Sequence, residues 1–421
     1  MYGEKMAIEI LGGNPVQGII RVQGSKNAVL PIIAATVLCE GQTIIDNCPD
    51  ITDVHAMAEV LRGVGGRVTY GRHRLVIDTS EMTSGLIEED KVTEIRASIL
   101  LLGSMLARFN KVKIHYPGGC SIGSRPIDFH LQSFRNMGVK TIENENYIEC
   151  EMEHGLCGAD IQLEFPSVGA TENILLAAVL ANGTTRIRNA AREPEIIELC
   201  DFLCAMGAKI QGAGTNCIVI CGVKKLQPIS WRLGMDRIGF LTYAMVVAGC
   251  GGEATLLTDG NVPECQIEIL KKLGCHIEKT PDEVIVQQKG MPKAISYICT
   301  EPYPGYPTDG QSLLMAVLSK SRGISTIEEG IFENRFRMIK QLHKMGANID
   351  YVSNRASITG VTKLHGANVC ADDLRSGAGL LIAAAMAEGK SEVHQEKYIY
   401  RGYEDIVENF RRLGIYARER K

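Results

Sequence analysis

The chain has 421 residues, 45% of them hydrophobic and 22% charged, which is usual for globular protein but more than one hydrophobic core normally supports. A net charge of -4 excludes a general attraction to nucleic acid or to anionic membranes, so the expected partners are small molecules held by local basic groups. The first residues lack a secretory signal, and the apolar runs are too short to span a bilayer. We therefore expect a cytoplasmic protein of two domains, with neither nucleic acid nor membrane as a partner.

The 14 cysteines contain no CxxC pair, as is usual for free thiols in a reducing compartment. Cys200, Cys204, Cys217 and Cys221 could be drawn as a zinc site. Three residues rather than two separate the members of each pair, however, and the pairs fall in an ordinary helix-then-strand pattern. We expect no metal site.

A strand-like segment, EKMAIEILGG, opens the chain and turns at Asn14-Pro15 into a second one, GIIRVQG, which predicts a hairpin. The first of six very apolar helices follows it. Helices that are apolar all round are typically buried on every side. The six segments in chain order are NAVLPIIAATVL, ASILLLGSMLA, ENILLAAVLA, GFLTYAMVVAG, QSLLMAVLS and GLLIAAAMA.

A second, amphipathic helix follows each buried one and ends in the same pattern: a large apolar residue, two variable residues, an apolar residue and glycine. A glycine at the end of an amphipathic run is a helix stop signal. Successive glycines of this pattern are 67 to 73 residues apart, which predicts six repeats of strand, buried helix, strand, amphipathic helix and hairpin. The six glycines are Gly65, Gly138, Gly207, Gly274, Gly346 and Gly414.

The sixth repeat ends at IYARERK without a hairpin, so we expect the N-terminal hairpin to complete it. This arrangement predicts an α/β protein of two lobes with three repeats each and a cleft between them. The first lobe comprises residues 21–230 and carries the loop of Cys120. The second comprises residues 1–20 plus 231–421.

The loops that enter the buried helices carry polar and basic groups. Helix N-termini present unpaired N–H groups and partial positive charge, which suit phosphate or carboxylate. The serine and aspartate residues could instead serve only as N-caps, but capping does not explain the basic residues. These loops contain Ser25-Lys26-Asn27, Arg96, Ser167-Val168-Gly169, Asp236-Arg237, Thr308-Asp309 and Asp373-Leu374-Arg375.

Repeat two has the longest segment between its second strand and its helix-ending glycine, and the extra residues fall in 117–126. Insertions in one repeat tend to form loops on a binding face. Cys120 is flanked by Gly119 and lies near Arg125, whose charge favours the reactive thiolate. Cys120 is therefore a candidate general acid or nucleophile, with an incidental loop cysteine as the alternative.

Asp309 follows the proline-rich segment PYPGYP, which indicates a rigidly placed carboxylate able to take a proton from a sugar hydroxyl. A plain N-cap is the alternative. Arg401, in the segment YRGY, is not distinguishable by itself from a solvated arginine at a helix start.

Taken together, these motifs resemble the UDP-N-acetylglucosamine 1-carboxyvinyltransferase family along the whole chain. Members of that family are two-lobed inside-out α/β barrels, with helices wrapped by sheets, and catalyse the first committed step of peptidoglycan synthesis. The motifs in order are GSKNAVLP, RASILLLG, PGGCSIGSRPIDFH, PSVGATENILLAA, AREPEI, PYPGYPTD, IFENRF, DDLRSGAGL and RGYE.

The resemblance implies transfer of the enolpyruvyl group of phosphoenolpyruvate to the 3'-hydroxyl of UDP-N-acetylglucosamine, by addition and elimination, without metal or cofactor. It implies that Lys26, Asn27, Arg125 and Arg401 contact phosphoenolpyruvate and that Asp309 deprotonates the hydroxyl. The nucleotide sugar is expected to contact Arg96, Arg125, Pro126, Ile127, Asp128, Phe129, Ser167, Val168, Gly169 and Ile331, with Arg375 lining the cleft.

By the same resemblance, Cys120 protonates the enol carbon, forms a covalent pyruvyl-phosphate adduct and is alkylated by fosfomycin. The sequence leaves open whether this cysteine acts mainly as an acid or mainly as a covalent trap. Some relatives have a basic residue where this chain has Phe165, so the resemblance does not extend to a diphosphate contact at that position.

Two other functions fit the same scaffold. An enolpyruvyl transferase acting on shikimate 3-phosphate shares fold and donor but lacks a PGGC-type loop, so Cys120 argues against it. A non-catalytic nucleotide-sugar binding protein has no use for an acid and a base, so Cys120, Asp309 and Lys26 argue against that.

Overall fold

The computed structural model describes residues 7–83, 87, 96–116 and 127–420. The chain divides into two compact units. The N-terminal unit contains the described residues between 24 and 234, and the C-terminal unit joins residues 7–23 to residues 235–420. No helix in these described ranges is long and apolar enough to cross a membrane.

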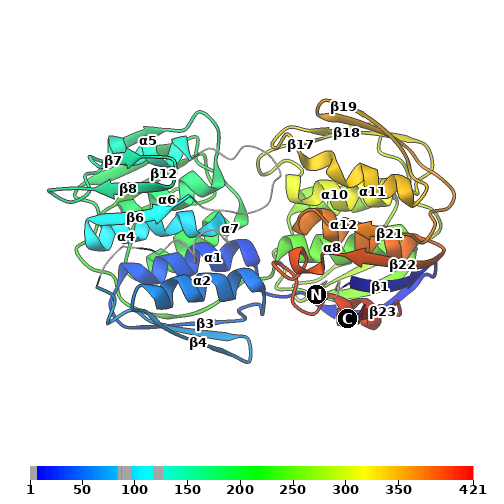
Figure 1. The fold of residues 1–421 in the computed structure, drawn as a ribbon, viewed down its shortest axis with the longest axis horizontal. Helices are drawn as coiled ribbons and strands as arrows, with labels where there is room; N and C mark the ends of the chain where they lie inside the picture. Colours follow the sequence, from blue (N-terminus) through cyan, green and yellow to red (C-terminus); the bar gives the residue numbers. More distant parts are fainter. Residues whose placement is uncertain (1–6, 84–86, 88–95, 117–126, 421) are drawn as a thin grey trace. The chain divides into compact units, whose positions relative to one another are not determined.

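Three apolar helices lie at the centre of each unit and contact one another (Figure 1). Their burial on all sides removes a large apolar area from water, which is the main favourable term in folding. All six predicted buried helices are present: α1 (Lys26–Ala35), α4 (Leu101–Phe109) and α6 (Val168–Ala178) in the N-terminal unit, and α8 (Arg237–Cys250), α10 (Thr308–Leu318) and α12 (Leu374–Met386) in the C-terminal unit.

Amphipathic helices follow the buried ones and place only one side in the core. They are α2 (Thr52–Gly63), α5 (Asp128–Asn136), α7 (Pro194–Ala205), α9 (Glu264–Leu273), α11 (Ile339–Lys344) and α13 (Ile406–Arg412). Short 3-10 helices extend or precede others: η1 (Thr36–Leu38), η2 (Arg96–Leu100), η3 (Arg335–Met338) and η4 (Glu396–Tyr398).

The described strands of the N-terminal unit form three sheets, ordered β11-β12-β10-β9, β13-β3-β5-β4 and β6-β8-β7. Buried and exposed residues alternate along most of these strands, as in sheets with one face on the core. The strands are β3 (Gln42–Asp46), β4 (Arg67–Gly71), β5 (Arg74–Asp78), β6 (Lys111–His115), β7 (Lys140–Glu143), β8 (Tyr147–Glu151), β9 (Asp160–Gln162), β10 (Thr184–Arg188), β11 (Lys209–Gln211), β12 (Cys217–Cys221) and β13 (Ser230–Arg232).

The described strands of the C-terminal unit also form three sheets, ordered β21-β22-β1-β23, β15-β16-β14-β2 and β17-β18-β20-β19. The strands are β1 (Ala7–Gly12), β2 (Val16–Arg21), β14 (Gly252–Leu257), β15 (His276–Lys279), β16 (Glu283–Gln288), β17 (Ile298–Thr300), β18 (Ile324–Glu329), β19 (Asn348–Val352), β20 (Arg355–Thr359), β21 (Asn368–Cys370), β22 (Gly389–His394) and β23 (Tyr416–Arg420).

The same strand pairing recurs around the buried helices. In the repeats of α6, α10 and α12, the strand before the helix runs parallel to the strand after it: β9 with β10, β17 with β18, and β21 with β22. In the first two of these repeats a hairpin continues the sheet in antiparallel register: β11 and β12 beside β10, and β19 and β20 beside β18. In the third, β1 and β23 from the two ends of the chain take the place of the hairpin. With helices inside and sheets outside, the predicted inside-out α/β fold built from six repeats is confirmed.

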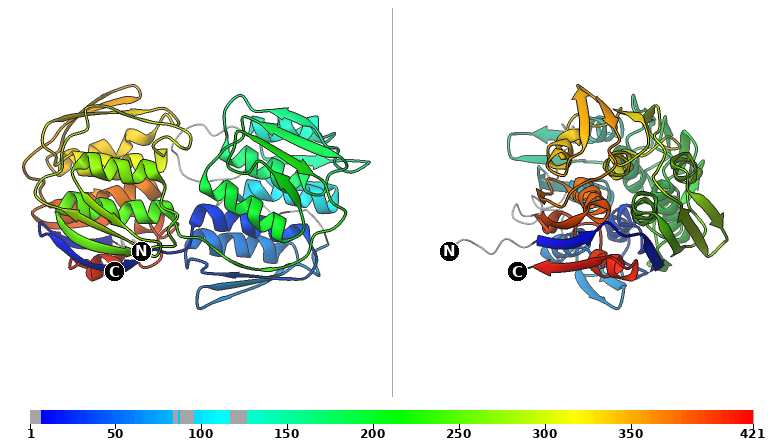
Figure 2. Two further views of the ribbon diagram at one scale, coloured as in Figure 1. Left: turned by 180° about the vertical axis from the view of Figure 1, so that it is seen from behind. Right: turned by 90° about the vertical axis from the view of Figure 1, so that its right-hand side faces the viewer.

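The predicted N-terminal hairpin is wrong. Strand β1 joins the last sheet, pairing with β22 and β23, and Figure 2 shows it in blue beside the red β23. Strand β2 instead runs parallel to β14, and β13 runs parallel to β3. Strand β2 thus precedes α1 of the N-terminal unit but completes a sheet of the C-terminal unit. Strand β13 precedes α8 of the C-terminal unit but completes a sheet of the N-terminal unit. The chain therefore changes unit at 23/24 and 234/235, a few residues after the expected boundaries.

The six glycines predicted to stop helices all have positive φ, between 79° and 110°. The residue after each glycine donates its N–H to the carbonyl of the large apolar residue that opens the repeated pattern, as Ala208 does to Leu203 at 2.9 Å. This is the bond that closes a Schellman motif. The five donor–acceptor pairs equivalent to it are Gly66–Leu61, Val139–Phe134, Cys275–Leu270, Ala347–Leu342 and Ile415–Phe410.

Replacing Gly207 with alanine should lower the free energy of unfolding by about 1 kcal/mol, because an L-residue is strained in the left-handed region. Its φ is +110°, and no atom lies within 4 Å of an added Cβ, so backbone conformation alone is tested. Gly71→Ala is the matched control in the same unit, with equal free space and a φ outside that region. Urea denaturation measures the free energy of unfolding of both variants. An equal loss in Gly207→Ala and Gly71→Ala would contradict the explanation by backbone strain.

Candidate active site

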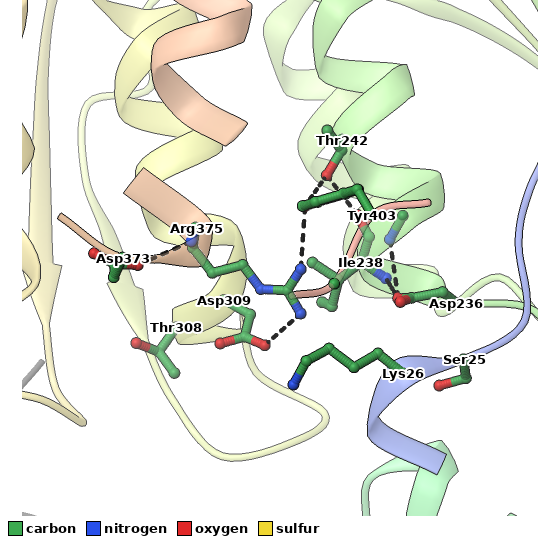
Figure 3. A network of polar contacts seen from close by, with 12 residues as sticks. Ser25, Lys26, Asp236, Ile238, Thr242, Thr308, Asp309, Asp373, Arg375 and Tyr403 are labelled. Atoms are coloured by element: carbon green, nitrogen blue, oxygen red, sulfur yellow. Dashed lines mark hydrogen bonds and ion pairs between the residues drawn. The ribbon is translucent and has the colours of Figure 1, made fainter. Parts of the chain in front are cut away.

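A carboxylate at the start of α10 is held by two arginines from other elements of the C-terminal unit. Figure 3 shows one of them, Arg375, beside the carboxylate of Asp309. The Arg335 Nη2 donates to Asp309 Oδ1 at 2.9 Å, and the Arg375 Nη2 donates to Asp309 Oδ2 at 3.0 Å. The side chains of Arg335 and Arg375 are only 3% and 4% exposed, whereas that of Asp309 is 26% exposed. The carboxylate is thus the member of this group that solvent or a substrate can reach.

Burial by itself would raise the pKa of Asp309, but the charges of Arg375, Arg335 and Arg237 outweigh burial and hold the pKa far below its ordinary value of 3.8. Burial likewise disfavours the charged form of Arg375, and Asp309 reverses this and raises its pKa. Asp309 is therefore ionised throughout the physiological range.

The backbone near Ile331 is tied to the same group through Glu329. One oxygen of Glu329, Oε1, accepts the N–H groups of Ile331 at 3.0 Å and Phe332 at 3.1 Å, and the hydroxyl of Thr308 at 3.0 Å. Thr308 in turn accepts a bond from Arg335 Nε at 3.2 Å. Ile331 and Asp309, which are 22 positions apart, are thereby held in one network.

The loop of Arg401 is fixed by the amide of Gln23, which is 5% exposed. Gln23 Nε2 donates to the Gly402 carbonyl at 2.9 Å, and Gln23 Oε1 accepts the Glu404 N–H at 3.1 Å. Arg401 itself is half-buried. The next residue but one, Tyr403, bonds Arg375, so this loop belongs to the group around Asp309.

In the N-terminal unit, Lys26 opens α1 and its Nζ pairs with Asp53 Oδ2 at 3.0 Å. Asp53 lies in the first turn of α2 and is almost fully buried. Glu172 on α6 is also buried near Lys26, and burial, with Glu195 and Glu193, raises its pKa well above the ordinary value. Lys26 is thus paired with the buried carboxylate of Asp53, while burial disfavours a second negative charge on Glu172 beside it.

Asn173 of α6 joins three elements of the N-terminal unit. Its Nδ2 donates to the Ile99 carbonyl at 3.0 Å and lies 2.8 Å from His130 Nδ1, while its Oδ1 accepts the Gly103 N–H at 2.9 Å. An amide NH₂ can only donate, so His130 Nδ1 accepts. The imidazole of His130 also lies close to Gly169. A Cβ added to this glycine would be only 3.3 Å from Cε1 of the ring.

The remaining sequence candidates of the N-terminal unit lie around these helix starts. Ser167 caps α6, its Oγ accepting the Ala170 N–H at 3.3 Å, so the capping interpretation of its side chain is confirmed. Helix η2, which Arg96 begins, contacts both α1 and α6. The other candidates are Asn27 in α1, Ile127, Asp128 and Phe129 at the start of α5, and Val168 and Gly169 at the start of α6.

The capping alternative for Asp309 is wrong. Pro307 occupies the N-cap position of α10, and the carboxylate of Asp309 accepts hydrogen bonds from two arginines instead.

The exposed Phe165 accepts the Ser167 N–H with its backbone carbonyl. Cys120, Arg125 and Pro126 lie outside the described residues.

Several residues of the site were not found by sequence reasoning. Arg335 stood in the quoted IFENRF motif and Tyr403 in RGYE, but neither carried a signal of its own. Asp53, Glu329 and Thr242 lie in segments that gave no functional signal. Within the described ranges, no group of three or more histidine, cysteine or acidic side chains is arranged to hold a metal ion.

A family model described as EPSP synthase (3-phosphoshikimate 1-carboxyvinyltransferase) matches residues 10–410, nearly the whole chain. The chain belongs to the enolpyruvyl transferase family. This enolpyruvyl transferase is 44% identical, over 96% of its length and 97% of the relative, to the UDP-N-acetylglucosamine 1-carboxyvinyltransferase 2 of Caldanaerobacter subterraneus subsp. tengcongensis. The UDP-N-acetylglucosamine 1-carboxyvinyltransferase of Corynebacterium jeikeium is 43% identical over 97% of this chain and 98% of its own.

Solved structures of other enolpyruvyl transferases share the fold. That of NikO from Streptomyces tendae covers 99% of both chains with a TM-score of 0.88 at 23% identity. An EPSP synthase from Acinetobacter baumannii covers 99% of this chain and 100% of its own with a TM-score of 0.75 at 18% identity. At these identities, the likeness concerns the fold alone.

Replacing Asp309 with asparagine should destabilise the enolpyruvyl transferase by about 3 kcal/mol at neutral pH, because two buried arginines lose their counter-charge. A carboxyl whose pKa is depressed on folding stabilises above its ordinary pKa and loses that contribution as pH falls through the folded value. The gap between wild type and Asp309→Asn should therefore stay constant from pH 8 to about 5 and shrink below about pH 4.

Urea denaturation at a series of pH values measures this gap. The control is Glu388→Gln, which removes an exposed ion pair with Lys363 in the same unit and should have little effect. A gap that widened with acid would contradict the ionised state assigned to Asp309.

Proposed function

We propose that this chain transfers the enolpyruvyl group of phosphoenolpyruvate to the 3'-hydroxyl of UDP-N-acetylglucosamine in the cytoplasm, releasing phosphate, as the first committed step of peptidoglycan synthesis. The observation that carries the proposal is the carboxylate of Asp309, kept ionised yet accessible at the start of α10. A hydroxyl that adds to an enol phosphate loses its proton, and a positioned carboxylate can take it. The relatives, 40 to 44% identical over nearly the whole chain, are named for the same acceptor and the same transferred group.

The reaction balances as an addition followed by an elimination. In the addition, the 3'-oxygen bonds to C2 of phosphoenolpyruvate, its proton passes to Asp309, and C3 gains a proton from Cys120. In the elimination, the Cys120 thiolate takes a proton back from C3, the bond from C2 to the phosphate oxygen breaks, and the double bond re-forms. The proton held by Asp309 leaves with the phosphate, so both residues return to their starting states. Neither step changes oxidation state, so neither needs a redox partner.

The low pKa of Asp309 has a consequence for timing. A carboxylate paired with two arginines is a weak base, so it cannot fully deprotonate a free sugar hydroxyl beforehand. The hydroxyl becomes acidic only as its oxygen bonds to C2. Asp309 therefore takes the proton during carbon–oxygen bond formation.

The proposal assigns each substrate its own set of groups. Lys26, Asn27, Arg125 and Arg401 bind phosphoenolpyruvate and stabilise charge that develops on its phosphate and carboxylate. The buried Asp53 supports this role of Lys26 by fixing its ammonium group. The proposed contacts of the nucleotide sugar are Arg96, residues 125–129, residues 167–169 and Ile331, with Arg375 beside Asp309.

A second candidate acceptor is shikimate 3-phosphate, because the matching family model is described by that substrate. The solved EPSP synthases resemble this chain at only 18% identity, whereas the relatives at 40 to 44% are named for UDP-N-acetylglucosamine. The higher identity favours the nucleotide sugar.

Phosphate release from phosphoenolpyruvate, measured with each acceptor in turn, tests the proposal. We expect release with UDP-N-acetylglucosamine and none with shikimate 3-phosphate. Asp309→Asn should lower kcat by about 100-fold to 10,000-fold, the usual contribution of a general base. Release with shikimate 3-phosphate alone, or with neither acceptor, would overturn the assignment.

Replacing Cys120 with aspartate tests the role of the loop cysteine. An aspartate can still donate a proton to C3 but is a poor nucleophile toward an epoxide. We therefore expect phosphate release to persist and inactivation by fosfomycin to disappear. A Cys120→Asp enzyme that fosfomycin still inactivates would place the reactive thiol elsewhere. Cys204→Ala, which removes an exposed cysteine of the N-terminal unit, is the control.

A further inference from the structure

We propose that Tyr403, supported by Thr242, is a positioning residue that orients the guanidinium of Arg375 toward Asp309. The inference rests on the proposed function, because it concerns the group that we assign as the base. Tyr403 contributes through its hydroxyl, which no substrate contact assigned above involves. Figure 3 shows the chain of contacts that links Thr242, Tyr403, Arg375 and Asp309.

The direction of every hydrogen bond in this chain follows from the groups present. Thr242 Oγ1 lies 2.8 Å from the Ile238 carbonyl, which can only accept, so the Thr242 hydroxyl donates there. Its oxygen therefore accepts from the Tyr403 hydroxyl, 2.7 Å away. The Tyr403 oxygen accepts from Arg375 Nη1 at 3.1 Å. The bonds run in one direction from the guanidinium to the first turn of α8.

Tyr403 is held tightly enough to act as a reference point. Its side chain is fully buried, and Gln23 bonds the backbone of Gly402 and Glu404 on either side of it. Burial raises the pKa of Tyr403, so the phenol stays protonated and keeps the hydrogen that it donates to Thr242. The chain is therefore stable in this direction across the working pH range.

The orientation of Arg375 matters because its guanidinium is planar and rigid. With Nη1 on Tyr403 and Nη2 on Asp309 at 3.0 Å, both ends of the fork have a partner and the plane cannot rotate. Without the phenol oxygen, a buried N–H would lack an acceptor, and the guanidinium would turn to find one. Asp309 would then lose the partner that sets the direction of one of its oxygens.

The alternative is that Tyr403 serves only as a large core side chain. Phenylalanine would then replace it with no effect on catalysis by the folded protein. Tyr243 provides a matched control, because it is equally buried in the same unit and its hydroxyl accepts from Asn409 Nδ2 at 2.8 Å. Removing the Tyr243 hydroxyl costs one buried hydrogen bond and removing the Tyr403 hydroxyl costs two, and only the Tyr403 hydroxyl bonds Arg375.

The experiment compares Tyr403→Phe, Thr242→Val, their double variant and Tyr243→Phe in phosphate release, after normalising to folded protein. We expect Tyr403→Phe to lower kcat about 10-fold with KM for UDP-N-acetylglucosamine nearly unchanged, the effect of a group that acts only in the transition state. Tyr243→Phe should keep its kcat. The double variant should be no slower than Tyr403→Phe, because Thr242 acts only through Tyr403.

The pH profile gives a second readout that a purely structural role would not move. Weaker pairing with Arg375 raises the pKa of Asp309, so the acid limb of kcat should shift to higher pH in Tyr403→Phe and stay in place in Tyr243→Phe. An unchanged kcat and acid limb in Tyr403→Phe would overturn the inference.

If the proposed function is wrong, the wild type will release no phosphate with UDP-N-acetylglucosamine, and this result separates that failure from a failure of the positioning role. The carboxyl of Asp309 could still be titrated by carbon-13 NMR in both tyrosine variants, with Asp309→Asn used for assignment. A higher pKa in Tyr403→Phe than in Tyr243→Phe would support the positioning role. Equal values would overturn it.

Discussion

The ion pairs between Asp309 and the buried guanidinium groups of Arg335 and Arg375 are the constraint on which the C-terminal unit depends. Charges taken out of water are tolerated only when their partners are fixed in position. Arg375 comes from the start of α12, 66 positions from Asp309, and Arg335 comes from η3, 26 positions from it. The N-terminal residues of these helices must therefore be held in fixed positions. The packing of the buried, mainly apolar parts of α10 and α12 against each other fixes them.

Burying helices and covering them with sheets brings functional loops to the helix N-termini. Each unit packs three helices together, and the repeated glycine stop lets the chain leave each amphipathic helix in the direction of the next hairpin. Strands β2 and β13 complete sheets of the unit that the chain is about to leave. Gln23 lies two residues after the end of β2 and fixes the loop of Tyr403, so this exchange of strands also contributes to the site.

The sequence predicted the features that are written locally and repeated. Six apolar helices and six helix-ending glycines could be identified because periodicity and turn chemistry act over a few residues. Asp309, Lys26 and Arg375 could be selected because they stand at helix starts. Strand β2 could not be placed, because a hairpin and a parallel pairing with β14 have the same local pattern. Arg335, Thr242 and Tyr403 were missed because their roles arise from contacts between distant segments, such as the 161 positions between Thr242 and Tyr403.

The two units stabilise opposite charges by the same means. In one, the cation of Lys26 faces a buried Asp53, and burial disfavours a charge on the neighbouring Glu172. In the other, the anion of Asp309 faces buried arginines, which are themselves oriented by groups such as Tyr403. In each case the more exposed member of the pair is available to a substrate, and the buried member sets its charge and direction. Water cannot compensate the charge of the buried member, so that charge acts on its exposed partner. The buried residue therefore controls the charge and orientation of the exposed one without having to touch a substrate.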